Sequence, residues 1–205
     1  RGLNNQQQSA GNGFINKRFQ DDIEGPLLQL VIKLKRDQPI NTSSENFSAL
    51  YYGLVAYTKT GLWMKKFEYE LGKEMFDKII HAYYEKWKFK HPAPEDFKAT
   101  AEEVSGKSLA AIFEQLNKKG PLEKEEKKKI KFAPFFNLKE TQKYRYISVA
   151  PAIGYNFYDK LMVGGVVHNY NLPPSDFQFI AAPLFATGTK KLNGIGRAEY
   201  NLFQG

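Results

Sequence analysis

Apolar residues follow a helical period over the longest patterned stretch of the chain, residues 44–91. In its first half they recur at steps of three and four residues, which places them on one face of an α-helix: Phe47, Leu50, Leu54, Tyr57, Gly61, Met64, Phe67 and Leu71. Gly72 is placed to end this helix, because glycine readily adopts a positive φ angle. A second apolar face at residues 75–87 predicts another helix, which ends before Pro92. The pattern therefore predicts two antiparallel helices joined by a short glycine turn.

Shorter helical patterns lie on both sides of this pair. Apolar residues at helical spacing predict four further helices, at residues 14–22, 27–35, 94–104 and 109–119. Gly106 is placed to end the third of these. Residues 1–13 are mostly Asn, Gln and Gly, with almost nothing to bury, and we expect a mobile tail or linker there. Residues 14–120 are thus predicted to form an all-helical array.

The pattern changes to short alternating strands after Lys131. Polar and apolar residues alternate in Lys129–Phe132 and again in Tyr144–Val149, and turn residues separate the successive strands. This alternation predicts an antiparallel β-meander over residues 131–205. A charged linker at residues 121–130 joins it to the helical region. The predicted fold class is therefore α+β.

The strand region leaves two interpretations open. Phe and Tyr lie near the strand ends, while residues 161–167 and 179–185 carry no charge. This distribution is typical of the wall of an outer-membrane β-barrel. An ordinary soluble antiparallel sheet alternates in much the same way. Five strands are too few to close a membrane barrel, which needs about eight, so a barrel would require further strands.

The formal net charge of +8 raises the question of a nucleic-acid partner. Between Glu123 and Lys131, however, lysines are mixed with glutamates, and neither an arginine cluster nor a nucleic-acid motif accompanies them. We therefore expect no nucleic acid and interpret this run as a solvated charged segment, with an anionic membrane surface or lipopolysaccharide as the alternative. The absence of cysteine excludes disulfides, thiolate metal sites and cysteine nucleophiles.

A series of short motifs runs in order through the helical region: Tyr57-Thr58-Lys59-Thr60-Gly61, Leu71-Gly72, Tyr83-Tyr84, Trp87-Lys88-Phe89-Lys90-His91-Pro92, Pro94-Glu95-Asp96-Phe97, Glu103-Val104-Ser105-Gly106 and Phe113-Glu114-Gln115. This series resembles the gluzincin aminopeptidases, the family of membrane alanyl aminopeptidase. The resemblance covers roughly residues 14–120 and corresponds to the part of the catalytic domain downstream of the zinc ligands. The strand region is similar to the barrel segment that follows the peptidase in some bacterial relatives.

The resemblance implies a zinc-dependent enzyme that removes N-terminal residues from peptides, in the outer membrane or the periplasm. The zinc site of that family needs two His one helical turn apart, a further Glu ligand and a Glu base. The 205 residues contain only His81, His91 and His168, and no His-Glu-x-x-His sequence. We therefore expect a fragment of the enzyme that binds no metal and is inactive by itself. The alternative is a non-catalytic outer-membrane binding or anchoring module derived from the same family.

Tyr57 is the single candidate catalytic residue. The resemblance matches it to the tyrosine of the family's Tyr-x-Lys motif, which donates a hydrogen bond to the oxyanion that develops on the attacked carbonyl. Lys59 matches the lysine of that motif, while Thr60 stands where the family most often has glycine. The hydrophobic pattern by itself places Tyr57 on a buried helix face, as a core residue. The sequence therefore leaves two interpretations of Tyr57, as a catalytic residue and as a core residue.

Overall fold

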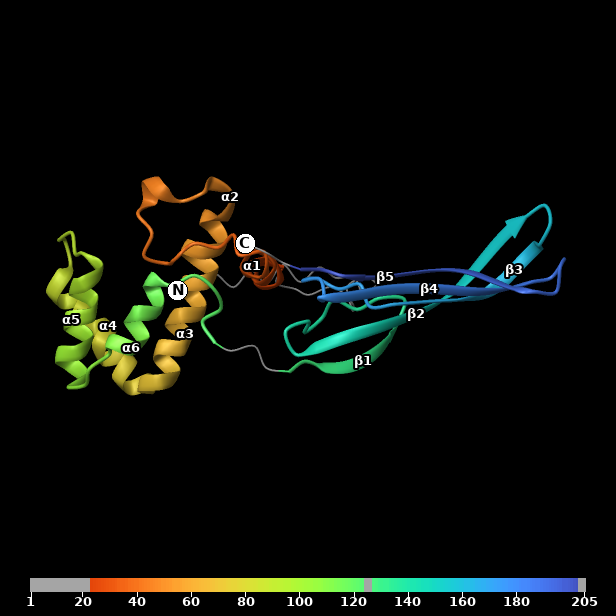
Figure 1. Cartoon of the computed structure of the whole chain (residues 1–205). Coiled ribbons are helices and arrows are strands. Elements are labelled where there is room, and N and C mark those ends of the chain that lie inside the picture. The colour runs from red at the N-terminus through yellow and green to blue at the C-terminus, as the bar shows by residue number, and fades with distance from the viewer. Residues whose placement is uncertain (1–22, 124–126, 203–205) are drawn as a thin grey trace. The chain divides into compact units, whose positions relative to one another are not determined.

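A computed structural model describes residues 23–123 and 127–202 of the chain, apart from the side chain of Leu50. Of the described residues, 27–123 form a helical unit, and 127–202 together with 23–26 form a sheet unit. Figure 1 shows helices in the first unit and strands in the second, which confirms the α+β class. The tail predicted at 1–13 and the helix predicted at 14–22 lie outside the described residues.

The helices are, in chain order, α1 (Glu24–Lys33), η1 (Ser44–Asn46), α2 (Ala49–Tyr52), η2 (Gly53–Lys59), α3 (Thr60–Leu71), α4 (Lys73–Trp87), α5 (Pro94–Ser105), α6 (Ala110–Phe113) and η3 (Glu114–Asn117). The predicted turn between α3 and α4 is at Gly72, whose φ of 82° suits a residue without a Cβ atom. Gly106 ends α5 in the left-handed conformation, with φ of 64°. Both glycines therefore act as helix terminators, as their positions predict.

The core of the helical unit is aromatic. Trp63 and Phe67 of α3 stack with ring centroids 5.3 Å apart, and Phe113 of α6 meets both rings edge-on. Ile79 of α4 is fully buried in the same cluster. The indole nitrogen of Trp63 donates to the carbonyl of Ile112 at 3.1 Å, so the polar atom of this buried ring is paired. These contacts hold α3 against α4 and α6.

The helix predicted from about residue 44 to Leu71 is present from Ala49 onward, but its first half does not keep the α-helical period. The chain forms a four-residue α2 and then a π-helix, η2, before α3 begins. The wider turn of a π-helix, with hydrogen bonds from i to i+5, shifts the positions that face inward. The inward positions are therefore spaced by four residues: Val55, Lys59, Trp63 and Phe67. Tyr57 and Gly61, predicted on the buried face, are exposed.

The sheet unit contains β1 (Lys129–Pro134), β2 (Tyr144–Asn156), β3 (Lys160–His168), β4 (Phe177–Ala186) and β5 (Leu192–Tyr200), in the spatial order β1-β2-β3-β4-β5. Strands β2 to β5 form the antiparallel meander that the sequence predicts. Strand β1 instead runs parallel to β2, so this part of the prediction is wrong. The hydroxyl of buried Tyr146 donates to the carbonyl of Lys139 and anchors the return loop at 135–143. The sheet is open, with β1 and β5 at its edges.

The two faces of the sheet differ in chemistry. One, which we call the apolar face, includes Val149, Ile153 and Tyr155 of β2, Leu161, Val163 and Val167 of β3, Phe177, Phe179, Ala181 and Phe185 of β4, and Leu192 and Tyr200 of β5. The opposite face, which we call the polar face, is mixed: it carries Ser148, Asn156, Lys160, His168, Gln178, Asn193, Arg197 and Glu199 together with small residues and with Met162, Val166, Ile180, Leu184 and Ile195. The register between the strands aligns each set across the sheet.

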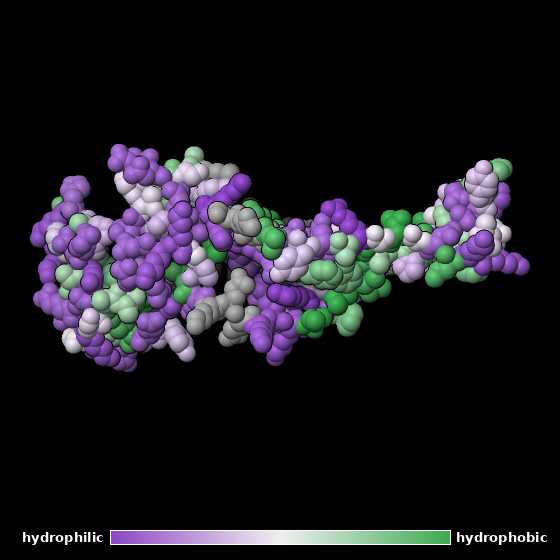
Figure 2. All heavy atoms as spheres, in the orientation of Figure 1, coloured by the Kyte–Doolittle hydropathy of each residue, from purple (hydrophilic) through white to green (hydrophobic). Residues whose placement is uncertain are grey.

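The buried side chains of this sheet lie on its polar face, whereas a half-buried soluble sheet buries its apolar face. The buried strand residues lie on the polar face, among them Tyr146, Ser148 and Gln178. The large apolar strand residues that are exposed lie on the apolar face, apart from Ile195. Figure 2 shows hydrophobic residues along the visible surface of the strands, whereas the visible surface of the helices is mostly hydrophilic. A sheet packed on a soluble core normally buries its apolar side.

The turn between β2 and β3 supplies a test of pH dependence. Asp159 accepts hydrogen bonds from the Thr189 hydroxyl at 2.7 Å and the Asn156 amide at 2.8 Å, and these bonds lower the pKa of its carboxyl group. The pKa of Asp159 is thus lower in the folded protein than in the unfolded protein, where it is about 3.9. Its ionised form therefore stabilises the fold above the unfolded pKa, and this stabilisation is lost as the pH falls through the folded pKa.

We therefore expect the sheet unit to lose stability as the pH falls below about 4, and Asp159→Asn to reduce that loss. Urea unfolding of the wild type and the variant at pH 7 and at pH 3 measures the effect. An equal loss of stability in both proteins would show that Asp159 contributes nothing to it.

Candidate functional site

The candidate site surrounds Tyr57 on the π-helix η2. The Tyr57 side chain is 67 % exposed. Its ring meets that of Tyr52 edge-on at 5.7 Å, and Tyr52 meets Phe47 in the same way at 5.4 Å. The three rings form a small aromatic surface of the helical unit. The core position that the hydrophobic pattern gives to Tyr57 is therefore wrong.

The hydroxyls of Tyr52 and Tyr57 are hydrogen-bonded to each other. This bond and the electrostatic interaction with Tyr57 raise the pKa of Tyr52 above its ordinary value. A raised tyrosine pKa means that the protonated form is favoured, which is the form that donates. The two tyrosines are therefore close neighbours, and either hydroxyl can donate to the other.

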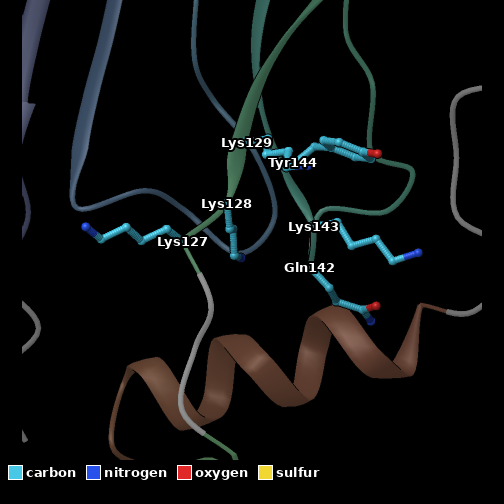
Figure 3. Close-up of a pocket in the computed structure, with 6 residues that line it drawn as sticks. All are labelled: Lys127, Lys128, Lys129, Gln142, Lys143 and Tyr144. Carbon is cyan, nitrogen blue, oxygen red and sulfur yellow. The ribbon is translucent and has the colours of Figure 1, made fainter.

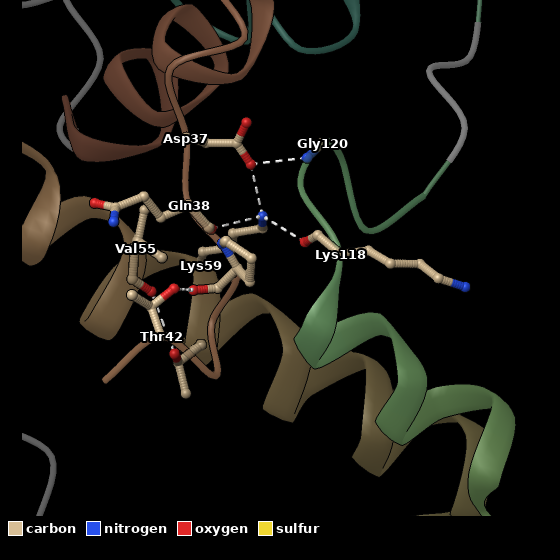
Figure 4. Close-up of polar contacts among 9 residues, drawn as sticks. Asp37, Gln38, Thr42, Val55, Lys59, Lys118 and Gly120 are labelled. Atoms are coloured by element: carbon tan, nitrogen blue, oxygen red, sulfur yellow. Dashed lines mark hydrogen bonds and ion pairs between the residues drawn. The ribbon is translucent and has the colours of Figure 1, made fainter. Parts of the chain in front are cut away.

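Lys59 is buried, whereas Tyr57, two residues earlier in the chain, is exposed. Its ammonium lies 2.8 Å from Asp37 Oδ2, and both side chains are 1 % exposed. The same carboxylate oxygen accepts the backbone N–H of Gly120 at 2.8 Å, as Figure 4 shows. The carbonyls of Gln38 and Lys118 complete the shell of the ammonium at 3.4 and 3.5 Å. A buried ion pair with these further partners ties two loops to η2.

Thr60 supports the π-helix. Its hydroxyl donates to the carbonyl of Val55 at 3.2 Å, and its backbone N–H is directed to the carbonyls of Val55 and Tyr57. The contact to Val55 spans five residues, which is the hydrogen-bond step of a π-helix. The threonine therefore stabilises the local backbone that presents Tyr57.

Sequence reasoning missed two residues of this arrangement, Asp37 and Tyr52. Asp37 lies in a loop, and a charged residue in a loop is usually solvated, so no local signal marks it as buried. Tyr52 precedes Tyr57 by five residues, a spacing that brings side chains together on a π-helix and not on an α-helix. An α-helical template therefore could not pair these two tyrosines.

The three histidines belong to other segments of the chain than the π-helix that carries Tyr57. His81 and His91 are exposed. His168 lies in the sheet unit, where Nδ1 accepts the backbone N–H of Tyr170 and Nε2 lies 3.2 Å from the carbonyl of Phe135. Within residues 23–123 and 127–202, no three His, Cys, Asp or Glu side chains are grouped so that they could hold a metal ion.

Comparison of the chain with models of protein families, with curated proteins and with solved structures gives no significant match. In the part of the chain that the structure describes, none of the helices has the length and apolar character needed to cross a membrane.

Proposed function

We propose that the helical unit is part of a zinc aminopeptidase of the gluzincin type and that Tyr57 donates a hydrogen bond to the oxyanion during peptide hydrolysis. The observation that carries this proposal is that the two side chains of the Tyr-x-Lys motif lie on opposite sides of the π-helix. Tyr57 is exposed on a π-helix, while Lys59 anchors that π-helix through a buried ion pair. Short π-helical segments are rare and are frequent at functional sites.

The geometry of Tyr57 suits this role. The Tyr52 ring packs edge-on against the Tyr57 ring at 5.7 Å, and the Lys59–Asp37 pair holds the backbone two residues away. A donor fixed before the reaction stabilises a developing oxyanion strongly, because little reorganisation is needed when the charge forms. The zinc of an intact enzyme, which activates the attacking water, requires ligands that these 205 residues do not contain.

Replacing Tyr57 by phenylalanine in the intact enzyme is expected to lower kcat by about 10²–10³-fold with little change in KM, because the lost bond forms only in the transition state. The measurement is zinc-dependent release of an aminoacyl reporter. Tyr69→Phe is the matched control, since Tyr69 is 89 % exposed on the neighbouring helix α3. An unchanged kcat for Tyr57→Phe, or an equal loss in the control, contradicts the assignment.

We further propose that the sheet unit belongs to the wall of an outer-membrane barrel, with its apolar face toward lipid. Strands β3, β4 and β5 contain 9, 10 and 9 residues, and a transmembrane β-strand needs about 9–11. Tyr200 pairs with Phe177 at one end of the apolar face, and Tyr155 lies at the other end. Aromatic residues at both ends of an apolar band are typical of barrel walls.

This proposal places the helical unit in water beside the membrane. The open edges of β1 and β5 would have to pair with further strands, because unpaired backbone groups are very unfavourable in lipid. Fractionation of the native protein tests the membrane location. Recovery in the soluble fraction without detergent would contradict the barrel and leave a soluble α+β protein.

The second candidate function is a non-catalytic outer-membrane binding or anchoring module derived from the same family. The exposed apolar face of the sheet favours it, since anchoring requires no active site. The two candidates differ in the intact gene product. Zinc-dependent aminopeptidase activity of that product supports the enzyme, whereas a purified product without zinc and without activity supports the module.

A further inference from the structure

A basic cavity of about 210 Å³ lies at one end of the sheet, where strands β1 and β2 begin. Its lining residues are Lys127, Lys128, Lys129, Gln142, Lys143 and Tyr144 (Figure 3). The backbone N–H of Lys129 donates to the carbonyl of Lys143 at 3.0 Å and joins the two segments. Parallel pairing of β1 with β2 is the reason that both basic segments begin at the same end of the sheet.

The four lysines that line this cavity form what we call the lysine cluster. Lys127, Lys129 and Lys143 are exposed, and Figure 3 shows the side chains of the cluster spreading outward from the two strand ends. The Glu140 carboxylate accepts a hydrogen bond from Lys143 at 3.1 Å, which raises the pKa of that lysine and keeps it charged. Four lysines at one end of the sheet concentrate positive charge there, which favours a bound anion.

The surroundings of the cluster favour an anion further. The Lys131 ammonium lies 3.4 Å from the ring centre of Tyr144. The cation–π contact holds the Tyr144 ring in place beside the cavity. The Gln142 amide is a neutral donor next to the lysines. Ammonium groups and an amide donor together are suited to phosphate oxygens.

We propose that the lysine cluster binds a phosphate-bearing anion, with the headgroup of an anionic membrane lipid as its source. The spread of the side chains suits several phosphates at a surface better than one enclosed phosphate. Clusters of lysine near a membrane attract anionic lipids in this way. The lipid source rests on the membrane location proposed above, whereas the anion site rests on the lysines themselves.

The test is a titration of the full chain in neutral detergent micelles, followed by ³¹P NMR. Three probes are compared: phosphatidylglycerol, zwitterionic phosphatidylcholine and inorganic phosphate. One variant changes the four lysines of the cluster to glutamine. The control changes four exposed lysines of the helical unit to glutamine, namely Lys73, Lys78, Lys107 and Lys119. Both variants lower the net charge by the same amount.

We expect phosphatidylglycerol to bind the wild type and the control variant and to bind the cluster variant at least a hundredfold more weakly. Each lysine at an anionic surface contributes about fivefold in affinity. Equal binding of inorganic phosphate would support the anion site and assign it to free phosphate. An equal loss in the control variant would show a general charge effect and overturn the proposal, as would no binding of any probe. These outcomes are independent of the catalytic test on Tyr57.

Discussion

Replacing Lys59 by methionine is expected to lower the free energy of unfolding of the helical unit by about 3–5 kcal/mol. The substitution leaves the Asp37 carboxylate buried without its cation, and an uncompensated buried charge is strongly unfavourable. The N–H of Gly120 remains as a partner of Asp37, but a single backbone donor does not replace an ammonium. Urea unfolding followed by far-ultraviolet circular dichroism measures the change.

Lys86→Met is the matched control for this prediction. Lys86 forms an ion pair with Glu103 at the same distance of 2.8 Å, but its side chain is 49 % exposed. An exposed pair contributes about 0–1 kcal/mol, so the control should change stability little. The double variant Asp37→Leu with Lys59→Met should be more stable than Lys59→Met alone, because no buried charge is left unpaired. Equal effects of Lys59→Met and Lys86→Met would mean that the Lys59–Asp37 pair is not buried in solution.

Replacing Val149 by lysine is expected to lower the stability of the sheet unit in a bilayer by about 2–4 kcal/mol. Val149 lies on the apolar face, where it pairs with Val167 between the aromatic ends of the strands. The proposed barrel places this position near the middle of the hydrocarbon layer, where a charged side chain is unfavourable. Urea titration of the protein folded in lipid vesicles measures the change.

Ile195→Lys is the control for that substitution. Ile195 is also aliphatic and is 77 % exposed, but it lies on the polar face opposite Ala182. A charge on the face that points away from lipid should alter stability by less than about 1 kcal/mol. In a soluble sheet both positions are exposed to water, and neither lysine should be unfavourable. A neutral effect of Val149→Lys would therefore contradict the lipid-facing surface.

The sequence pattern predicted the elements that depend on local periodicity. The alternation of side chains from Tyr144 to Tyr200 and the turn residues between strands predicted the meander of β2 to β5. Glycine at residues 72 and 106 predicted two helix ends, because positive φ angles there suit a residue without a Cβ atom. These features depend on neighbouring residues and on backbone sterics, which a single sequence displays.

The parallel pairing of β1 with β2 depends on contacts between distant residues. An antiparallel hairpin is the simpler expectation for two strands joined by a short connection. The hydrogen bond from Tyr146 to the Lys139 carbonyl holds the loop that returns the chain instead. No periodicity in the sequence displays such a contact, and the lysine cluster at the shared strand end is one of its consequences.

By itself the sequence determined the α+β class, the helix ends at glycine and the antiparallel strands, because each depends on local spacing. Tertiary structure alone decided which side of residues 53–59 faces inward. The buried pair of Lys59 with Asp37, 22 residues apart, accompanies the π-helix that leaves Tyr57 exposed. An α-helical period assigned that tyrosine to the core. Asp37, which stabilises the buried Lys59, lies far away in the sequence. The residue pattern around Tyr57 therefore could not show that Tyr57 is exposed.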